Sequence, residues 1–116
     1  MATPPPPSST PVPPEDNDND NLLAVRLRIT GTVQGVWYRA SAVSQARRVG
    51  VSGTVSNAAD GSVVATVAGP PAAVDAFVAW ARVGPPAATV RGVEVTRLPG
   101  SGGVKLGGGM TIVRSG

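Results

Sequence analysis

The sequence predicts an α+β domain in which one antiparallel sheet carries two helices on the same face. Three observations lead to this fold class. Apolar and polar residues alternate in four or five short stretches, as in strands that are covered on one side. Two longer stretches repeat their apolar residues at helical spacing, and glycine or proline separates each stretch from the next. The predicted order is strand, helix, strand, strand, helix, strand, with a short fifth strand as an option.

The first strand and the first helix are expected at residues 22–32 and 37–50. In the strand, Val25, Leu27 and Ile29 share one side, and charged or polar residues share the other. The helix "WYRASAVSQARRVG" ends in a glycine that suits a helix C-terminus. Its apolar stripe consists of Ala42, Val43, Ala46 and Val49.

The second and third strands follow as "VSGTVSN" (51–57) and "SVVATVAG" (62–69), which both alternate with period two. Between them, "NAADG" contains Asp60 followed by Gly61, a pair that favours a tight reversal between antiparallel strands. We therefore expect these two strands to form a β-hairpin.

The second helix is the clearest element of the pattern. The segment "GPPAAVDAFVAWARVG" (69–84) starts with prolines, which are favoured in the first turn of a helix, and a glycine and two further prolines follow its end. Its apolar stripe consists of Val74, Phe77, Val78 and Ala81.

The last elements complete a recognisable order. Residues 89–98 predict a strand with Val93 and Val95 inward, residues 99–109 a glycine-rich loop, and residues 110–115 ("MTIVRS") the short final strand. This order is that of a ferredoxin-like split βαβ sandwich. Because that architecture hosts many unrelated functions, the function must be argued from a site.

Composition divides the chain into two parts. Residues 1–21 combine proline with Ser, Thr, Asp and Asn, so we expect a disordered, proline-rich and acidic tail, and residues 22–116 form the folded domain. The start of the chain lacks the basic and apolar segments of a signal peptide. No apolar run approaches the roughly 20 residues that span a bilayer. We therefore expect a cytoplasmic protein that does not enter the membrane.

The net charge of +3 conceals a split, because four of the seven acidic residues lie in the tail. From residue 22 onward, ten basic residues and three acidic ones leave a charge of +7, which attracts phosphate metabolites, nucleic acid or an acidic partner. Cysteine and histidine are absent, which excludes disulfides, thiol nucleophiles, imidazole bases and the usual zinc ligands. Three widely spaced carboxylates do not suit a metal site either, so we expect no cofactor.

Two places in the chain suggest a site for an anion. The loop "GTVQGVWYR" joins the first strand to the first helix, where backbone N–H groups lack helical partners and Arg39 can add a bidentate contact to phosphate. Asn57 ends the apolar face of the second strand and could point at the mouth of that loop. The alternative interpretations are a plain turn with a solvated arginine and an asparagine favoured near turns.

Two motifs in the chain resemble those of the acylphosphatase family. The first is Gly-x-Val-Gln-Gly-Val-x-(Phe/Tyr)-Arg, and residues 31–39 match every fixed position. The second is Gly-x-Val-x-Asn-x-x-Asp-Gly-x-Val, which residues 53–63 match likewise. The resemblance covers residues 22–98 and resumes at "MTIVRS". Two matched motifs at the family's separation are far more specific than a lone glycine-rich loop.

The resemblance implies an acylphosphatase, which hydrolyses the carboxyl–phosphate bond of acyl phosphates by in-line attack of water, without a metal or a covalent intermediate. It implies that Arg39 and Asn57 are catalytic, since Arg39 would bind the phosphate oxygens and Asn57 would orient the water. It also implies that the phosphate contacts Gln34, Gly35, Val36, Trp37, Tyr38 and Arg39. The chemistry agrees with what the chain lacks, because a carboxylate whose conjugate acid has a pKa of about 4 leaves without a proton donor.

Two other functions are weighed against this one. An inactive domain of the same fold would bind a phosphorylated ligand or protein, but it would need Arg39 without Asn57. Nucleic-acid binding ranks last, because the chain's four aromatic residues lie in the motif loop and the second helix and leave the sheet without a stacking surface.

We expect a monomer that acts on a small acyl phosphate, with inorganic phosphate or sulfate able to occupy the site. Trp37 either narrows the mouth of the loop or packs as an aromatic anchor, and the second role is preferred.

Overall fold

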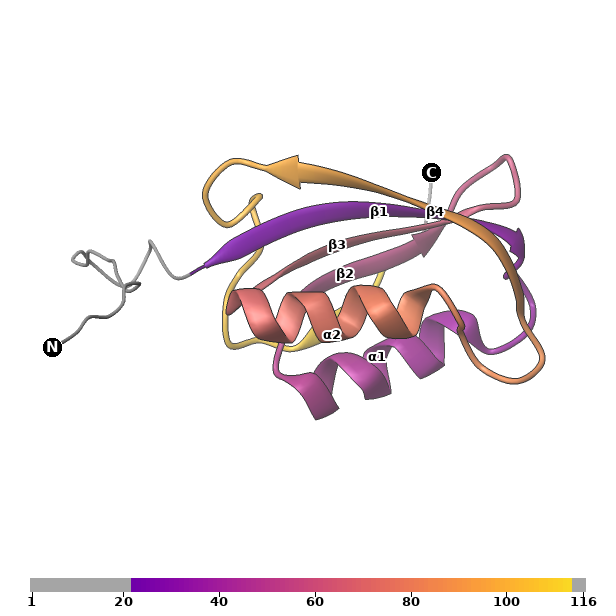
Figure 1. Ribbon diagram of the computed structural model, residues 1–116, viewed down its shortest axis with the longest axis horizontal. Helices are drawn as coiled ribbons and strands as arrows, with labels where there is room; N and C mark the ends of the chain where they lie inside the picture. The colour runs from indigo at the N-terminus through magenta and orange to yellow at the C-terminus, as the bar shows by residue number, and fades with distance from the viewer. Residues whose placement is uncertain (1–21, 114–116) are drawn as a thin grey trace, which may run out of the picture.

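The computed structural model describes residues 22–113 and shows one five-stranded sheet with two helices (Figure 1). The elements, in chain order, are β1 (Leu23–Thr32), α1 (Tyr38–Val49), β2 (Ser52–Asn57), β3 (Val63–Gly69), α2 (Pro71–Ala81), β4 (Thr89–Leu98) and β5 (Met110–Ile112). The predicted β-α-β-β-α-β order is confirmed, and the optional fifth strand forms. The tail predicted for residues 1–21 lies outside the described residues.

The strands are arranged in the order β4-β1-β3-β2-β5. All neighbours are antiparallel except β2 and β5, which pair in parallel with Gly53 opposite Met110. The antiparallel sheet predicted for the first four strands is confirmed, and the optional fifth strand makes the complete sheet mixed. The reason is topological: β4 is antiparallel to β1, and one reversal through residues 99–109 returns the chain in the direction of β1 and β2.

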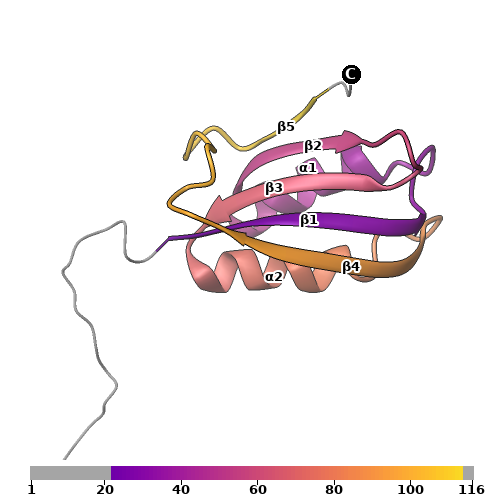
Figure 2. The ribbon, with the colours of Figure 1, turned by 90° about the horizontal axis from the view of Figure 1, so that it is seen from above.

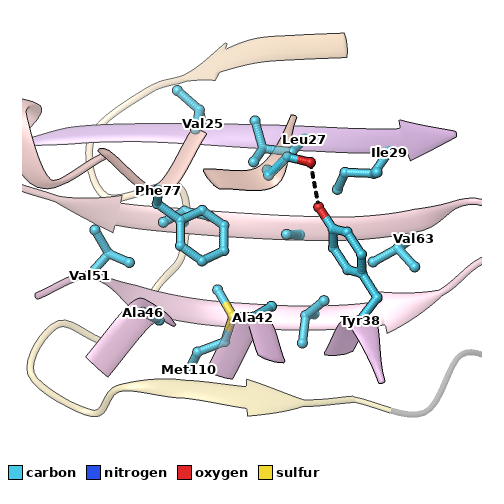
Figure 3. Packing of buried hydrophobic residues seen from close by; sticks show 14 of the residues in the cluster. Val25, Leu27, Ile29, Tyr38, Ala42, Ala46, Val51, Val63, Phe77 and Met110 are labelled. Atoms are coloured by element: carbon cyan, nitrogen blue, oxygen red, sulfur yellow. Dashed lines mark hydrogen bonds between the residues drawn. The ribbon is translucent and has the colours of Figure 1, made fainter. Parts of the chain in front are cut away.

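Both helices lie on the same face of the sheet, with α1 over β2 and β5 and α2 over β1 and β3 (Figures 1 and 2). The core between the layers consists of the inward side chains of the strands and the buried stripes of the helices (Figure 3). The aromatic rings of Tyr38 and Phe77 lie 5.2 and 5.7 Å from that of Trp80, measured between ring centroids. Met110 is 7% exposed and fills the core at the β5 edge.

The predicted inward side of these strand residues is confirmed, since Val95 pairs with Leu27 and shares its face, but the residues are not all fully buried. Val25, Leu27 and Ile29 are buried, and Val93 packs against the core. Val95, also predicted inward, is 45% exposed. The cause is its position on an edge strand, because the helices pack over the inner strands and leave part of β4 uncovered. Within residues 22–113, no helix is long and apolar enough to cross a membrane.

The topology brings the two sequence motifs to one end of the sandwich. Strands β1 and β2 run in the same direction, because each is antiparallel to β3. Helix α1, which connects them, runs back in the opposite direction. The start of α1 therefore lies beside the C-terminal ends of β1 and β2, where the first motif ends in Arg39 and the second contains Asn57.

Candidate active site

The loop between β1 and α1 has an unusual backbone. Gly35 has φ 73°, and Trp37 has φ 67° and ψ 17°, both in the left-handed region. Trp37 is the one residue other than glycine with a positive φ within residues 22–113. A backbone that alternates between left-handed and other conformations turns successive N–H groups toward a common point. The Trp37 carbonyl then accepts a hydrogen bond of 2.9 Å from the Ser41 N–H, which starts α1.

The N–H groups of this loop and of the first helical turn are free to bind a ligand. The backbone N–H groups of residues 35–40 donate to no backbone acceptor within residues 22–113. The first turn of α1 contains no acidic side chain that could neutralise them. Such N–H groups and the positive end of the helix dipole form a natural site for phosphate. The loop predicted to bind an anion therefore offers backbone donors that an oxyanion could use, and the binding itself stays a prediction.

A pocket of about 350 Å³ opens beside this loop. It is lined by Val33, Gly35, Trp37, Tyr38, Arg39, Ala40 and Ile112. Arg39 therefore lies in the first turn of α1 and borders the same space as the loop. Ile112 comes from β5. The sequence predicted a short strand there, but it did not indicate that this strand would border the site.

Gln34 has a role that sequence reasoning missed. Its side-chain Nε2 donates hydrogen bonds to the carbonyl oxygens of Ala58 (2.8 Å) and Ser62 (2.9 Å). These two carbonyls flank the turn that follows Asn57, so the side chain of Gln34 joins the first motif to the second. Its side-chain amide is occupied in this way, and a contact of its backbone with phosphate stays a prediction.

Asn57 is the last residue of β2 and shares its side of the sheet with Val55, as the alternation predicted. Its Oδ1 atom is buried and accepts no hydrogen bond within the described part of the chain. A buried acceptor without a partner costs about 1–3 kcal/mol, so such atoms are uncommon and often serve a function. Asn57 therefore presents an acceptor that a polar ligand could use.

Tyr38 and Trp37 are neighbours with opposite environments. The Tyr38 ring is buried, its hydroxyl donates a 2.8 Å hydrogen bond to the Ala81 carbonyl (Figure 3), and burial raises the pKa of this hydroxyl above its ordinary value. Its side chain therefore belongs to the core, although Tyr38 also borders the pocket beside the loop. Trp37 is 78% exposed, so the preferred role as a packing anchor was wrong. The exposed side chain and the left-handed backbone occur at the same residue.

Asp60 fixes the turn between β2 and β3. Its carboxylate accepts hydrogen bonds from the Ser62 N–H (3.0 Å) and the Ser62 hydroxyl (2.6 Å) and forms an ion pair with Arg28. The Ser62 hydrogen bonds, followed by Arg28, lower the pKa of Asp60 to about 2. Asp60 is therefore an ionised structural group at neutral pH and does not serve as a proton donor.

Among the described residues, the loop that carries these N–H groups borders one pocket together with Arg39, and Asn57, which does not line that pocket, lies at the same end of the split βαβ sandwich. No group of three or more His, Cys, Asp or Glu side chains gathers around a point within residues 22–113. The arrangement is equipped to bind a tetrahedral oxyanion and to orient a small polar molecule beside it. The fold and the site thus define a small α+β protein that handles phosphoryl groups.

Comparisons with known proteins agree with this class. The acylphosphatase family profile matches residues 25–104. An acylphosphatase from Azoarcus sp. is 60% identical over 74 residues, which cover 64% of this chain and 76% of the relative. The chain therefore belongs to the acylphosphatase family, and its reaction is the hydrolysis of acyl phosphates.

Two solved structures support the fold. The acylphosphatase from Bacillus subtilis superposes with a TM-score of 0.68 at 31% identity, over 78% of this chain and 98% of its own. The acylphosphatase from Coxiella burnetii superposes with a TM-score of 0.75, over 84% of this chain and 99% of its own. At 23% identity, the second similarity is one of fold.

Proposed function

We propose that the chain cleaves acyl phosphates by in-line attack of water on a phosphoryl group held in the β1–α1 loop. The observation that supports this most strongly is the set of N–H groups at residues 35–40, which are free to donate beside Arg39. They would bind the equatorial oxygens, with Gln34 contributing through its backbone. Donors fixed in advance stabilise the charge on those oxygens without reorganisation, which is the main requirement of phosphoryl transfer.

Arg39 and Asn57 have different tasks in this mechanism. Arg39 donates to two phosphate oxygens through its planar guanidinium group. The Oδ1 of Asn57, which lacks a partner among the described residues, accepts a hydrogen bond from the attacking water and orients it. The proton of that water passes to the phosphate of the substrate, and the carboxylate leaves unprotonated. This chemistry requires neither a metal nor a cofactor.

The first test is the hydrolysis of benzoyl phosphate, followed by ultraviolet absorbance with a chelator present. We expect turnover by the parent and a loss of about a thousandfold in kcat/KM for Arg39→Gln and for Asn57→Ala. Arg47→Gln is the matched control, because Arg47 is exposed and lies in the last turn of the same helix. Circular dichroism checks that each variant retains the fold. Activity that disappears with the chelator would contradict the metal-free mechanism.

Binding of inorganic phosphate separates the two roles. Phosphate should raise the Tm of the parent and of Asn57→Ala by several degrees and should leave that of Arg39→Gln nearly unchanged, because a ligand stabilises only a chain that binds it. If the folded parent bound phosphate and turned over no acyl phosphate, the inactive binding module would replace the enzyme. If Asn57→Ala lost phosphate binding, its role would not be confined to water.

We also propose that the enzyme acts on a small-molecule acyl phosphate as a cytoplasmic monomer and that residues 22–116 are its folded unit. The absence of cysteine is compatible with a reducing compartment, and the motifs and the core lie within that range. Gel filtration with light scattering tests the monomer. Limited proteolysis of the full chain tests the boundary, and we expect a stable fragment that begins near residue 22.

A further inference from the structure

We propose that the side chains of Trp37 and Ile112 form a subsite for the acyl group and that the enzyme therefore prefers substrates with aromatic or other bulky apolar acyl groups. The inference rests on the proposed function, since it assumes that the phosphoryl group occupies the β1–α1 loop. It concerns the part of the substrate that the phosphate-binding residues do not touch.

The exposure of these two side chains is the first observation. Trp37 is 78% exposed and Ile112 is 44% exposed, and both border the same pocket of about 350 Å³ as Arg39. The pocket is within the usual size of small-molecule sites, which are mostly apolar and carry a few polar groups that orient the ligand. Here the polar groups are the loop N–H groups and the guanidinium of Arg39, and the exposed apolar side chains are those of Trp37 and Ile112.

The conformation of Trp37 is the second observation. A left-handed backbone is unfavourable for an L-residue such as Trp37, and an indole in water forgoes the gain from burial. Neither cost is offset by packing, since Trp37 lies outside the core cluster. Both costs become understandable if the indole contacts a ligand, because aromatic rings stack favourably on one another.

The position of Ile112 follows from the β5 strand. In the parallel pairing of β2 and β5, Ile112 lies opposite Val55, two residues before Asn57. It therefore reaches the end of the sheet at which α1 begins. The pocket thus has one wall from the phosphate-binding loop and another from the outermost strand of the sheet.

In-line displacement decides which side of the phosphoryl group the acyl group takes. The attacking water and the leaving carboxylate must lie on opposite sides of phosphorus. Asn57, which orients the water, does not line the pocket, and Gln34 holds its loop on the β2–β3 side. The leaving acyl group therefore points into the pocket, toward Trp37 and Ile112.

The test compares kcat/KM for benzoyl phosphate and acetyl phosphate, which share the reacting bond and differ in the acyl group. We expect the benzoyl-to-acetyl ratio to fall about tenfold in Trp37→Asn and severalfold in Ile112→Thr, as the loss of an apolar contact predicts. Asparagine tolerates the left-handed backbone, and threonine keeps the β-branched shape that suits a strand. Leu106→Asn is the control and should keep the parental ratio, because Leu106 is 43% exposed at the opposite end of α1.

A second measurement uses the parent alone and does not depend on how any variant folds. Benzylphosphonate should inhibit the enzyme with a Ki about tenfold lower than that of methylphosphonate, since both carry the same anionic group. Equal Ki values, or a substrate ratio that stays within twofold in both variants, would overturn the subsite. Failure of the proposed function would give different results. In that case the parent would hydrolyse neither of the two acyl phosphates, or the Arg39→Gln variant would remain active.

Discussion

Gln34 connects the two halves of the site through a single side-chain amide. Its hydrogen bonds to Ala58 and Ser62 cross from the phosphate-binding loop to the turn after Asn57. Each of these carbonyls also accepts from a backbone N–H within the turn, from Gly61 and Ala58 respectively. The glutamine therefore sets the distance between the two loops, and the turn after Asn57 also has backbone hydrogen bonds of its own.

Replacement of Gln34 by methionine should affect turnover more than phosphate binding. Methionine has a similar length and no N–H donor, so the loop that carries Asn57 loses its connection to the cradle. We expect kcat for benzoyl phosphate to fall about tenfold to a hundredfold, because small displacements of an orienting group are costly. The Ki of inorganic phosphate should change less than threefold, as measured by competitive inhibition.

The control for this prediction is Gln45→Met, which makes the same change within α1. The substitution should leave both kinetic constants near their parental values. If Gln34→Met instead raised the Ki of phosphate as much as it lowered kcat, the side chain would contact the phosphate directly, which is the role that the motif alone suggested.

For single residues, the sequence indicated that the two motifs lie near one another but not how every side chain is used. Arg39 and Asn57 could be placed at one end because strand direction and parity bring them there. The partners of Gln34 could not be predicted, since they are two carbonyls in a turn distant in sequence. The exposure of Trp37 could not be predicted either, because a tryptophan is usually buried and its left-handed backbone is unusual for a residue other than glycine.

Between elements, Tyr38 joins the start of α1 to the end of α2. Its hydroxyl donates to the Ala81 carbonyl, and its ring packs against Trp80. Gly84, three residues after Ala81, packs against the same ring, since a Cβ at this position would lie 2.8 Å from it. The first turn of α1, which supplies the cradle, is thus held by the second helix.

Tyr38→Phe should lower the free energy of unfolding by about 1 kcal/mol, because it removes one buried hydrogen bond and keeps the ring. The first motif accepts either aromatic residue, which agrees with a modest cost. Urea denaturation followed by circular dichroism measures the change. A loss above about 3 kcal/mol would show that the hydroxyl supports more than this one contact.

For the helices and strands, the prediction succeeded because the alternation of apolar and polar residues follows directly from which side of each element is buried. The bounds of β4 agree with the predicted strand, and those of the other elements differ by a few residues. The direction of β5 was the one feature of the sheet for which the sequence offered no prediction. A glycine-rich segment carries no periodic pattern, so the sequence did not show which edge of the sheet the chain would reach through residues 99–109.

For the whole molecule, the ionised carboxylate of Asp60 makes the stability of the fold depend on acidic pH. Its pKa is lowered from 3.8 to about 2 in the folded protein, so its carboxylate stabilises the fold above about pH 4. That contribution is lost as the pH falls from about 4 to 2. Asp60→Asn should therefore have a lower Tm than the parent at pH 7, and the difference should shrink over this range.

Thermal unfolding at a series of pH values measures this difference. Asp75→Asn removes the same charge from α2, where no ion pair involves Asp75 within residues 22–113, and it should follow the parent throughout. A difference between Asp60→Asn and the parent that stayed constant down to pH 2 would show that the side chain acts by shape and not by charge.

The position of β1 between β3 and β4 has a consequence for how the chain reaches this structure. Its neighbours in the sheet, β3 and β4, both lie far along the chain, and Leu27 pairs with Ala65 on one side and with Val95 on the other. Each pairing must close a long loop and lose its entropy before any stabilising contact forms. We therefore expect folding to be slow for a domain of this size, with a rate set by the meeting of distant strands.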